Sequence, residues 1–433
     1  MKRTLAVCIA TVLSFASGTA LAINDLEANA SIPFSFANPG ARSLGMGGAF
    51  IGLADDATAA YSNPAGLTQL RQVEVAAEAR HTAFSTPYVD SGNTTTNPFS
   101  TAGLRVLEDD SSTNNLSYFS IIVPAERWSF AFYRHELANF SSDFDTSAAL
   151  RFDDAPLFMT ESSIDLKIVN WGAAAAFRAT DRVSFGFGLS RYDFDLHSDT
   201  GRFFENRPLR LQTALQDGDD HGLGWNLGAR FGLSDSVSLG LTYRHAPRFD
   251  YTSQIIGLSD GTTPLNPPIQ QYGPSRVTFN IPDVFGIGLS WRPTDRLVVN
   301  LDVNRVRYSE LTDDISTFFD ITATQRLQIE DGNEAHLGAE YTFADMTHPF
   351  SLRAGIWHDP RHSVSFVGVP RPDQFQNNVT FDELFAAQFA GGRGAEKHYA
   401  IGGGWAFTNF QLDLAADLSD GLDTYSMSGV YRF

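Results

Sequence analysis

The sequence predicts an all-β protein: a 14-stranded antiparallel transmembrane β-barrel with a small N-terminal hatch, built of short helices, plugging its lumen. Three observations predict this fold. Segments of alternating apolar and polar residues recur along the chain, as expected for strands with one apolar face. Short polar turns alternate with long polar connections, which is typical of bacterial outer-membrane barrels. The last segment alternates up to a terminal aromatic residue, Phe433.

The N-terminus predicts a secretory signal peptide over residues 1–22. Lys2 and Arg3 form its charged region, residues 5–16 its apolar region, and Ala20-Leu21-Ala22 a cleavage site of small residues. The only cysteine, Cys8, lies in this segment, so we expect a mature chain without disulfides or thiol chemistry. The predicted location is the bacterial outer membrane.

Residues 23–70 break the strand pattern and are predicted to form the hatch. The stretch 40–49 is rich in glycine, residues 55–60 favour a short capped helix, and residues 63–67 form a turn. About 48 residues are too few for a strong core of their own. We therefore expect this segment to fold inside the barrel, which spans residues 71–433.

The strand alternation is clearest over residues 183–190. Val183, Phe185, Phe187 and Leu189 share one face, and only Ser and Gly occupy the other. Similar alternation recurs over 223–233, 237–243, 285–291, 337–343, 399–407 and 412–418. A soluble exported β-sandwich or propeller also alternates, but rarely with such a strict asymmetry of turns.

Six short turns alternate with seven outer connections, and this count requires fourteen strands. The short turns are expected at 124–127, 179–182, 234–236, 293–296, 344–349 and 408–409. Long loops are expected at 85–115, 139–162, 198–221, 251–275, 310–333 and 359–395, with a brief connection at 419–422. A closed barrel satisfies every backbone group without water, which an open sheet in lipid cannot do.

The composition of the 433 residues excludes other classes. Asp and Glu number 50 against 31 Lys and Arg, a net charge of −19, which argues against nucleic-acid binding. Hydrophobic residues make up 43%, too many for a disordered chain. Beyond the signal peptide no apolar run reaches 18 residues, which excludes transmembrane helices.

Three stretches resemble the FadL/TodX-type outer-membrane transporters. They are GARSLGMGGAFIGLADDATAAYSNPAGL at 40–67, IPDVFGIGLSWRP at 281–293, and GAEYTF at 338–343 followed by LRAG at 352–355. The resemblance covers nearly the whole mature chain, and DDATAAYSNPA is its most specific part. It implies a 14-stranded barrel with an internal hatch. It also implies inward movement of long-chain fatty acids or other hydrophobic compounds, through a hydrophobic pocket and a gap in the barrel wall near a kinked strand.

The expected function is therefore passive uptake of hydrophobic molecules, long-chain fatty acids first, gated by the hatch. One alternative is an accessory barrel that binds secreted proteins, because the GMGGAF form of the hatch also occurs in such a related branch. Another is a transporter of aromatic or alkane hydrocarbons. Expected partners are the hydrophobic cargo, outer-membrane lipid and lipopolysaccharide, and the barrel-assembly machinery during biogenesis. We expect a monomer without cofactor, metal or catalytic residues.

The candidate gating residues lie in the hatch. Asn63, Pro64 and Ala65 match its motif, in which Pro64 fixes the backbone and Asn63 can bond the local chain. The same three residues also suit a purely structural turn. Asp55 and Asp56 are candidates for ion pairs with lumen arginines that latch the hatch, or for simple helix capping.

The candidate substrate-binding residues come from the inward faces and the outer loops. With the apolar face toward lipid, the inward polar residues are Asn226, Arg230, Arg244, Asp302, Glu340, Arg353, Asp413 and Asp417. Of these, Arg230, Arg244 and Arg353 are candidates to bind a substrate carboxylate or the hatch aspartates. Phe203, Phe204 and Leu258 lie in predicted loops, where exposed apolar side chains suit cargo capture or mutual packing.

The third strand changes character along its length. Its apolar face carries Trp128, Phe130 and Phe132 and then continues into Arg134 and Glu136. Either the strand leaves the lipid zone at that point or a bulge shifts its phase. The pattern favours the first interpretation.

Overall fold

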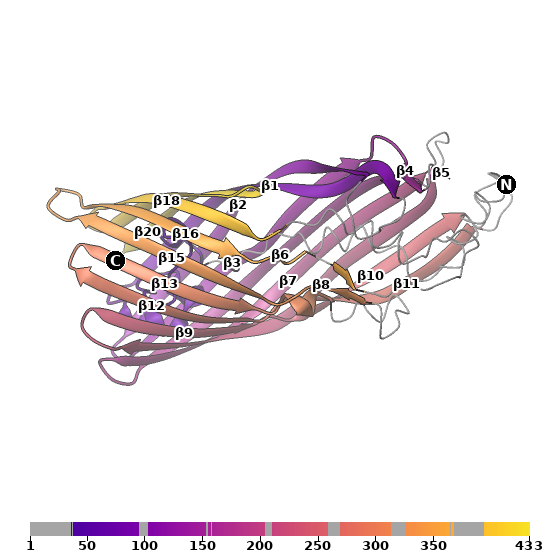
Figure 1. Ribbon diagram of the computed structural model, residues 1–433. Helices are drawn as coiled ribbons and strands as arrows, with labels where there is room; N and C mark the ends of the chain where they lie inside the picture. The colour runs from indigo at the N-terminus through magenta and orange to yellow at the C-terminus, as the bar shows by residue number, and fades with distance from the viewer. Residues whose placement is uncertain are drawn as a thin grey trace.

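The computed structural model describes residues 36, 38–94, 103–152, 155–156, 158–203, 210–258, 269–312, 326–363, 365–367 and 394–433. Within these residues, fourteen antiparallel spans close into a barrel, which confirms the predicted fold class (Figure 1). The barrel closes where β1 (Glu74–Thr94) pairs with β20 (Leu422–Arg432). The predicted signal peptide lies outside the described residues.

Twelve of the spans are single strands and two are broken. The other unbroken strands are β2 (Leu104–Ala125), β3 (Trp128–Asp145), β6 (Met159–Arg178), β7 (Val183–Phe203), β8 (Arg210–Gly232), β13 (Leu297–Val306), β15 (Gly332–Phe343), β16 (Phe350–Asp359), β18 (Glu396–Ala406) and β19 (Phe410–Leu418). The broken spans, as the structure describes them, are β9 (Val237–His245) with β10 (Arg248–Leu258), and β11 (Ile269–Asn280) with β12 (Val284–Thr294). Each break contains a proline, Pro247 or Pro282, which cannot donate to the ladder.

Shorter elements lie at the loop end of the barrel. They are β4 (Leu150–Phe152), β5 (Ala155–Pro156), η2 (Tyr308–Thr312), and a separate two-stranded pair of β14 (Arg326–Gln328) and β17 (Ser365–Val367). β4 and β5 lie near the N-terminus in Figure 1.

The strands extend well into the predicted long loops, so these loop boundaries were wrong. Strands β1 and β2 remain paired as far as Gly92 and Leu104, inside the predicted 85–115 loop. The six short turns do join consecutive spans. Above the membrane the outer face meets water and needs no apolar residues, so the hydrophobic alternation ends although the backbone pairing continues.

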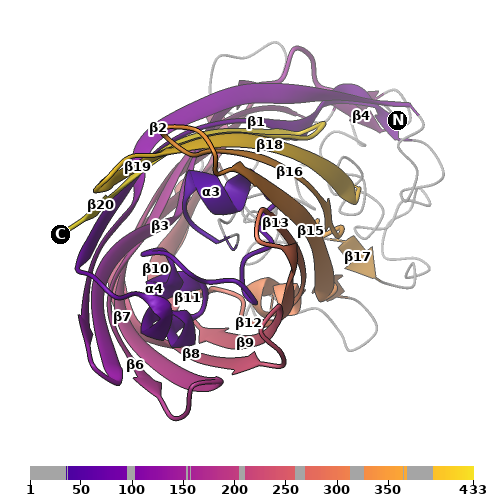
Figure 2. The ribbon, with the colours of Figure 1, turned by 90° about the vertical axis from the view of Figure 1, so that its left-hand side faces the viewer.

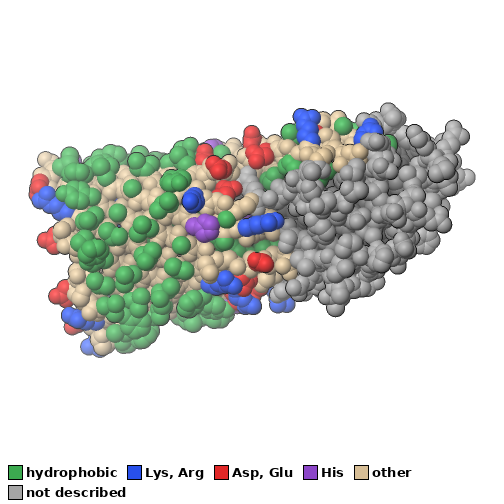
Figure 3. All heavy atoms as spheres, in the orientation of Figure 1, with side chains coloured by type: hydrophobic (Ala, Val, Ile, Leu, Met, Phe, Trp, Pro, Cys, Tyr) green, Lys and Arg blue, Asp and Glu red, His purple; other side chains and the backbone are tan. Residues whose placement is uncertain are grey.

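The outer surface carries an apolar belt next to the short turns, which is the periplasmic side in such barrels. Figure 3 shows hydrophobic side chains covering this end, with charged side chains beyond them. Phe187, Leu227 and Leu337, for example, are exposed on successive parts of the wall. This belt is the surface that contacts lipid.

The hatch fills the lumen at the level of the belt. It contains α3 (Ala41–Leu44), α4 (Ala59–Ser62) and η1 (Pro64–Gln69), and Figure 2 shows these helices inside the ring of strands. Its side chains are almost all buried. Among the described residues, no helix has the length and apolar character needed to cross a membrane.

Inward-facing glycines let the hatch backbone approach the wall. A methyl group at any of five wall glycines would overlap hatch atoms of residues 46–65: Gly186, Gly228, Gly240, Gly338 and Gly355. The close approach therefore requires residues without a side chain on this part of the wall. These five positions come from β7, β8, β9, β15 and β16, so the hatch is seated on much of the circumference.

Strand β3 contains a bulge, contrary to the interpretation that the sequence favoured. Its pairing with β6 shifts between Glu136 and Ala138 and then continues to Asp145. Its pairing with β2 ends at Tyr118 and His135. Above this point the wall has a seam between β2 and β3. A bulge re-aims the following residues, so Leu137 and Phe140 enter the interior.

Side chains bridge this seam. Asn115 donates to Glu136, and the Arg134 guanidinium donates to the Leu116 carbonyl and lies 3.0 Å from the Glu136 carboxylate. Further out, the Asp109 carboxylate accepts bonds from β3, including one of 2.8 Å from the Ser142 hydroxyl. Polar contacts, rather than a ladder, close this part of the wall.

Candidate functional site

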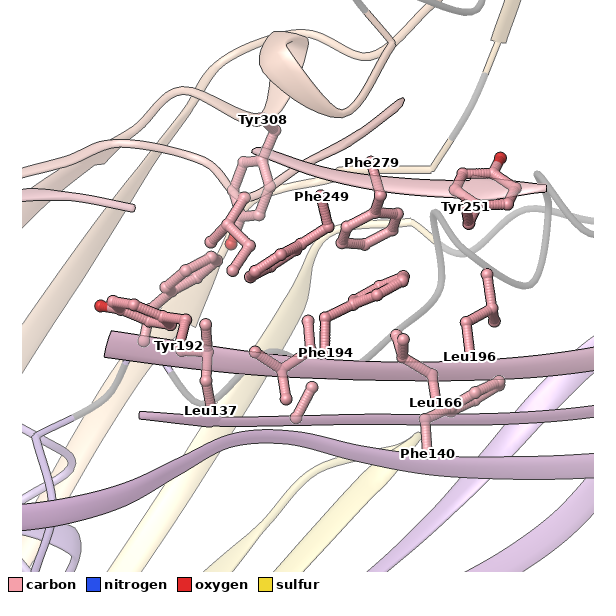
Figure 4. Close-up of a cluster of buried hydrophobic side chains, with 14 of the residues drawn as sticks. Leu137, Phe140, Leu166, Tyr192, Phe194, Leu196, Phe249, Tyr251, Phe279 and Tyr308 are labelled. Atoms are coloured by element: carbon pink, nitrogen blue, oxygen red, sulfur yellow. The ribbon is translucent and has the colours of Figure 1, made fainter. Parts of the chain in front are cut away.

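A cluster of buried apolar side chains lies inside the barrel above the hatch, and the part of the interior that it occupies is called the chamber below. Side chains from several strands meet there, as Figure 4 shows; labelled members are Leu137, Phe140, Leu166, Tyr192, Phe194, Leu196, Phe249, Tyr251, Phe279 and Tyr308. Phe194 stacks on Phe249 with ring centroids 4.8 Å apart and lies 5.5 Å from Phe279. Barrel interiors are ordinarily polar, so an apolar lumen indicates a site for hydrophobic molecules.

The chamber arises from a reversal of polarity along strands whose phase does not change. On β7, even-numbered residues face inward from Ser184 to Thr200. Near the periplasm the outward side is apolar, as at Phe187, and the inward side is small. From Tyr192 to Leu196 the inward side is apolar and the outward side carries charges such as Asp195. The reversal is visible in the sequence, where Tyr192, Phe194 and Leu196 alternate with Asp193 and Asp195.

Arg244 lies at the base of the chamber, where the structure places its side chain in the interior. It is buried, donates a 2.8 Å bond to the Phe36 carbonyl and covers the Tyr61 ring at 4.8 Å. Its Nε and Nη1 groups have no hydrogen-bond partner, and it forms no ion pair among the described residues. A buried cation without an anion is costly, so this guanidinium is poised to bind one.

Further buried polar groups complete the base. His135, Asn170 and Tyr192 occupy one row across β3, β6 and β7. Among the described residues neither ring nitrogen of His135 has a hydrogen-bond partner, and the Tyr61 ring lies against it, tilted by 36°, with the ring centroids 4.2 Å apart. Burial raises the pKa of Tyr61, while the nearby Arg244 acts in the opposite direction. The Tyr61 ring of the hatch contacts Arg244 as well as His135, so it connects Arg244 with this row of polar residues.

A network of charges fastens the hatch to the wall. Arg42 binds Asp55 at 2.6 Å and Glu340 at 2.9 Å, and Glu340 in turn binds Arg353, which reaches Asp413 at 2.7 Å. Burial by itself lowers the pKa of Arg42, but Asp55 and Glu340 together outweigh it and raise that pKa. Arg42 therefore stays charged.

The two predicted latch aspartates differ in their contacts. Asp55 binds Arg42 and also Arg292 of β12 at 3.0 Å. Asp56 approaches Arg42 at 3.4 Å and accepts bonds from the backbone and hydroxyl of Thr58, the residue that caps α4. Burial raises the pKa of Asp56, and Arg42 opposes this effect. Asp55 thus bridges hatch and wall, whereas Asp56 binds the backbone and hydroxyl of the cap residue Thr58 and does not occupy the helix cap itself.

Asn63 holds two hatch segments and the wall together. Its amide donates to the Ile51 carbonyl at 3.0 Å and to the Ala229 carbonyl of β8 at 3.3 Å. Its oxygen accepts from Ala65 at 3.2 Å, just after Pro64 begins η1. The motif therefore works as a clamp in this structure.

Asp302 of β13 was placed among the inward residues but not among the site candidates. Its carboxylate accepts bonds from the hatch amides of Phe50 and Ile51, at 2.6 and 2.7 Å. A wall carboxylate that binds two hatch amides is a second fastening point. Sequence spacing contains no sign of it, because Asp302 lies 252 positions after Phe50 and 251 after Ile51.

The three candidate arginines have different surroundings. Arg353 is committed to Glu340 and Asp413, so it is not available to a substrate carboxylate in this arrangement. Arg244 and Arg230 form no ion pair among the described residues, and Arg230 is only half-buried, near the periplasmic turns. The hatch aspartates pair with Arg42 and Arg292 rather than with any of the three.

The predicted loop candidates contribute less. Phe203 is half-buried and ends β7, and Leu258 ends β10 opposite Ile269, so both belong to strands rather than loops. Phe204 lies outside the described residues. Among the described residues, no group of three or more His, Cys, Asp or Glu side chains is arranged to hold a metal ion.

The geometry defines a class: a plugged outer-membrane barrel with an apolar chamber above the plug. Residues 28–376 match the family model of the outer membrane protein transport protein, OMPP1/FadL/TodX. Since this match covers most of the sequence, the chain belongs to that family. It is a bacterial outer-membrane transport protein, not an enzyme.

Relatives and solved structures agree with this family. Outer membrane protein P1 of Haemophilus influenzae is 24% identical over 383 residues, which cover 76% of this chain and 78% of that protein. A FadL homologue of Pseudomonas aeruginosa is similar in fold, with a TM-score of 0.63, 14% identity, and coverage of 92% and 99% of the two chains. The toluene transporter TodX of Pseudomonas putida is also similar in fold, with a TM-score of 0.56, 15% identity, and coverage of 92% of this chain and 98% of that chain.

Proposed function

We propose that the protein admits hydrophobic acids, long-chain fatty acids first among them, passively across the outer membrane, with the hatch as gate. The observation that carries the proposal is Arg244, which forms no ion pair with any described residue and lies beneath the apolar chamber. A fatty acid offers one carboxylate for this guanidinium and one acyl chain for the chamber. Because a single chain closes and plugs its own barrel, we expect it to act as a monomer.

Transfer into the chamber needs no external energy source. Each CH₂ group moved out of water contributes roughly 0.8 kcal/mol. The carboxylate meets a buried cation, where charge-assisted hydrogen bonds are at their strongest. Tyr61 and His135 face the same base and complete a polar floor. The cargo would therefore enter with its acyl chain toward the outside and its head group toward the hatch.

Binding of radiolabelled oleate to purified protein tests the head-group site. We expect Arg244→Gln to raise the Kd roughly tenfold to a hundredfold, the usual value of a lost charged hydrogen bond of ~1.5–3 kcal/mol. Arg191→Gln is the matched control, because Arg191 lies on the exposed outer face of β7. Equal oleate affinity in wild type and Arg244→Gln would reject the carboxylate site.

A reversible disulfide tests the gate. The hydroxyls of Thr68 in η1 and Ser184 in β7 lie 2.8 Å apart, so cysteines at both positions are close enough to bridge. The sequence has no other cysteine after Cys8. We expect the oxidised pair to stop oleate uptake by cells that lack their own fatty-acid channel, and reduction to restore it. Each single cysteine variant is the control, and full uptake by the oxidised pair would refute hatch gating.

A second candidate cargo is an aromatic hydrocarbon. The stacked rings of Phe194, Phe249 and Phe279 favour it, since aromatic pairs bind planar apolar molecules well. TodX, which is similar in fold, is described as a toluene transporter. Uptake of toluene but not oleate would select this candidate. Uptake of neither by an assembled barrel would favour the accessory barrel that binds secreted proteins.

A further inference from the structure

A group of basic side chains lies on the outer wall at the boundary of the apolar belt, over β13, β15, β16 and β18. Figure 3 shows blue and purple side chains next to the green belt on this face. Three of these strands carry an exposed basic residue just beyond the belt: Arg305 on β13, His358 on β16 and Lys397 on β18. Because the short turns lie at the opposite end of the belt, this boundary belongs to the outer leaflet of the membrane.

The three basic residues are neighbours in the β-sheet. One rung of outward-facing residues crosses the four strands and consists of Val303, Ala335, His358 and Lys397. Arg305 is the next outward residue beyond Val303. Three strand spacings of about 4.8 Å place the ends of this rung about 14 Å apart. Ala335 adds only a methyl group between them, so the surface has room for a broad headgroup with cations at both ends.

Exposed apolar side chains lie directly below these basic residues. Ile356 and Tyr399 pair with each other one outward position closer to the belt, and 39% and 59% of their surfaces are exposed. Two residues of a strand rise about 7 Å. An amphiphile whose anionic headgroup contacts the basic residues would therefore lay its acyl chains on the belt.

The basic side chains are accessible to an anion. Lys397 forms no hydrogen bond or ion pair with any described residue. The Nδ1 of His358 lies 3.2 Å from the Glu396 carbonyl, which leaves Nε2 to contact the solvent. Of the three, Arg305 alone has a carboxylate partner, Asp331, at 3.3 Å, and nearly half of its side chain remains exposed.

The charge of the outer wall is opposite on another part of the barrel. Outward residues of β6, β7 and β8 beyond the belt are mostly carboxylates, and this acidic sector contains Glu161, Asp165, Asp193, Asp195, Asp199, Asp217 and Asp219. On β13, β15, β16 and β18 no described outward residue is Asp or Glu, since Asp359 and Glu396 share the inward side of their strands. An anionic headgroup is therefore attracted to one sector and repelled by the other.

We propose that Arg305, His358 and Lys397 form a binding site on the outer wall for the phosphates of lipid A, the lipid anchor of lipopolysaccharide. Lipopolysaccharide occupies the outer leaflet of the outer membrane, the leaflet that this boundary faces. Its lipid A carries a phosphate at each end of a disaccharide, above several acyl chains. The basic residues at both ends of the rung and the apolar surface below match these parts.

Native mass spectrometry of the purified protein in detergent measures the binding of lipid A with both phosphates. We expect Arg305→Gln with Lys397→Gln to raise the apparent Kd at least tenfold, because each cation near an anionic lipid adds to binding. His358→Gln removes a neutral hydrogen-bonding ring and should raise it roughly threefold. Lys167→Gln with Arg191→Gln is the matched control, because it removes two exposed cations from β6 and β7 of the acidic sector. Arg305→Lys with Lys397→Arg keeps both charges and should keep the wild-type Kd.

Two other lipids test what the site recognises. Lipid A without phosphates should bind the wild type and the Arg305→Gln, Lys397→Gln protein equally, because only its acyl chains contact the belt. Phosphatidylglycerol has one phosphate and two acyl chains, so we expect it to bind the wild type at least tenfold more weakly than lipid A. Heat-modified mobility on gels verifies that each barrel is assembled.

The remaining outcomes would overturn the proposal. An unchanged Kd for lipid A in the Arg305→Gln, Lys397→Gln protein, or an equal loss in the matched control, would show that these cations do not form a site. Weaker binding of phosphate-free lipid A by that protein would show that the apolar surface, and not a phosphate contact, was altered. Equal binding of phosphatidylglycerol and lipid A by the wild type would contradict a site for lipopolysaccharide.

Discussion

Gly52→Ala should lift one corner of the hatch from the wall. A Cβ atom at Gly52 would lie 2.7 Å from the Ser290 nitrogen and 2.8 Å from the Leu289 carbonyl carbon. Both are backbone atoms of β12, which cannot move aside within the barrel. Ordinary contact needs about 3.4 Å, so the hatch must retreat by about 0.7 Å, and overpacking of this kind costs about 1–3 kcal/mol.

That retreat reaches the neighbouring hydrogen bonds. The bond from Ser238 to the Gly52 carbonyl is 2.8 Å, and the bond from the Ile51 amide to Asp302 is 2.7 Å. A shift of about 0.7 Å brings both close to 3.5 Å, where hydrogen bonds are lost. The segment beside the Asn63 clamp would therefore detach as a unit.

Entry of a small hydrophilic solute into the periplasm measures the result. We expect nitrocefin hydrolysis by intact cells with a periplasmic β-lactamase to rise several-fold in Gly52→Ala. Gly403→Ala is the matched control, because a methyl group there meets its nearest atom, in Phe350, at 3.4 Å. Wild-type permeability in a well-assembled Gly52→Ala barrel would show that the hatch does not seal by close backbone contact.

Three further changes probe the fastenings and the chamber. Arg42→Met leaves Asp56 without a cation and should destabilise the hatch by about 3 kcal/mol. Faster proteolysis of the hatch would measure this loss, and an unchanged rate of proteolysis would contradict the charge network. Asp302→Ala should speed hydrogen exchange at the Phe50 and Ile51 amides, since each charged bond is worth ~1.5–3 kcal/mol; unchanged exchange would discount this anchor. Phe194→Ala should raise the oleate Kd roughly tenfold to a hundredfold, from ~1.5–3 kcal/mol of lost apolar contact, and equal affinity would place the cargo elsewhere.

The sequence predicts the membrane part of this fold well, because lipid imposes a simple rule there. Residues such as Phe187 must be apolar and their neighbours small, so strands and the short turns are visible. Above the membrane that rule ends, and the extension of β1 and β2 was missed. Predicted inward residues such as Arg244 are buried because the phase of these strands never changes. The β3 bulge does change phase, and pattern alone favoured the wrong interpretation there.

The contacts of the site depend on partners far apart in the chain. The Arg42–Glu340 pair and the bonds of Asp302 to hatch amides join residues separated by about 250 to 300 positions. Periodicity tells which side of a strand a residue occupies, but not which hatch atom faces it. The commitment of Arg353 to Glu340 and Asp413 could therefore not be predicted, and neither could the absence of an ion pair between Arg244 and any residue that the structure describes.

The reversal of polarity on β7 makes the two ends of this barrel resemble different kinds of protein. The periplasmic end has an apolar outer face that contacts lipid. The outer end has a polar outer face that contacts water and an apolar interior, like a soluble ligand-binding barrel. Changes to Phe194 or Leu196 therefore leave the lipid-facing surface untouched, and changes to Phe185 or Leu189 leave the chamber untouched. Cargo preference and membrane insertion can consequently vary independently, which makes the outer end a natural place to redesign selectivity without disturbing assembly.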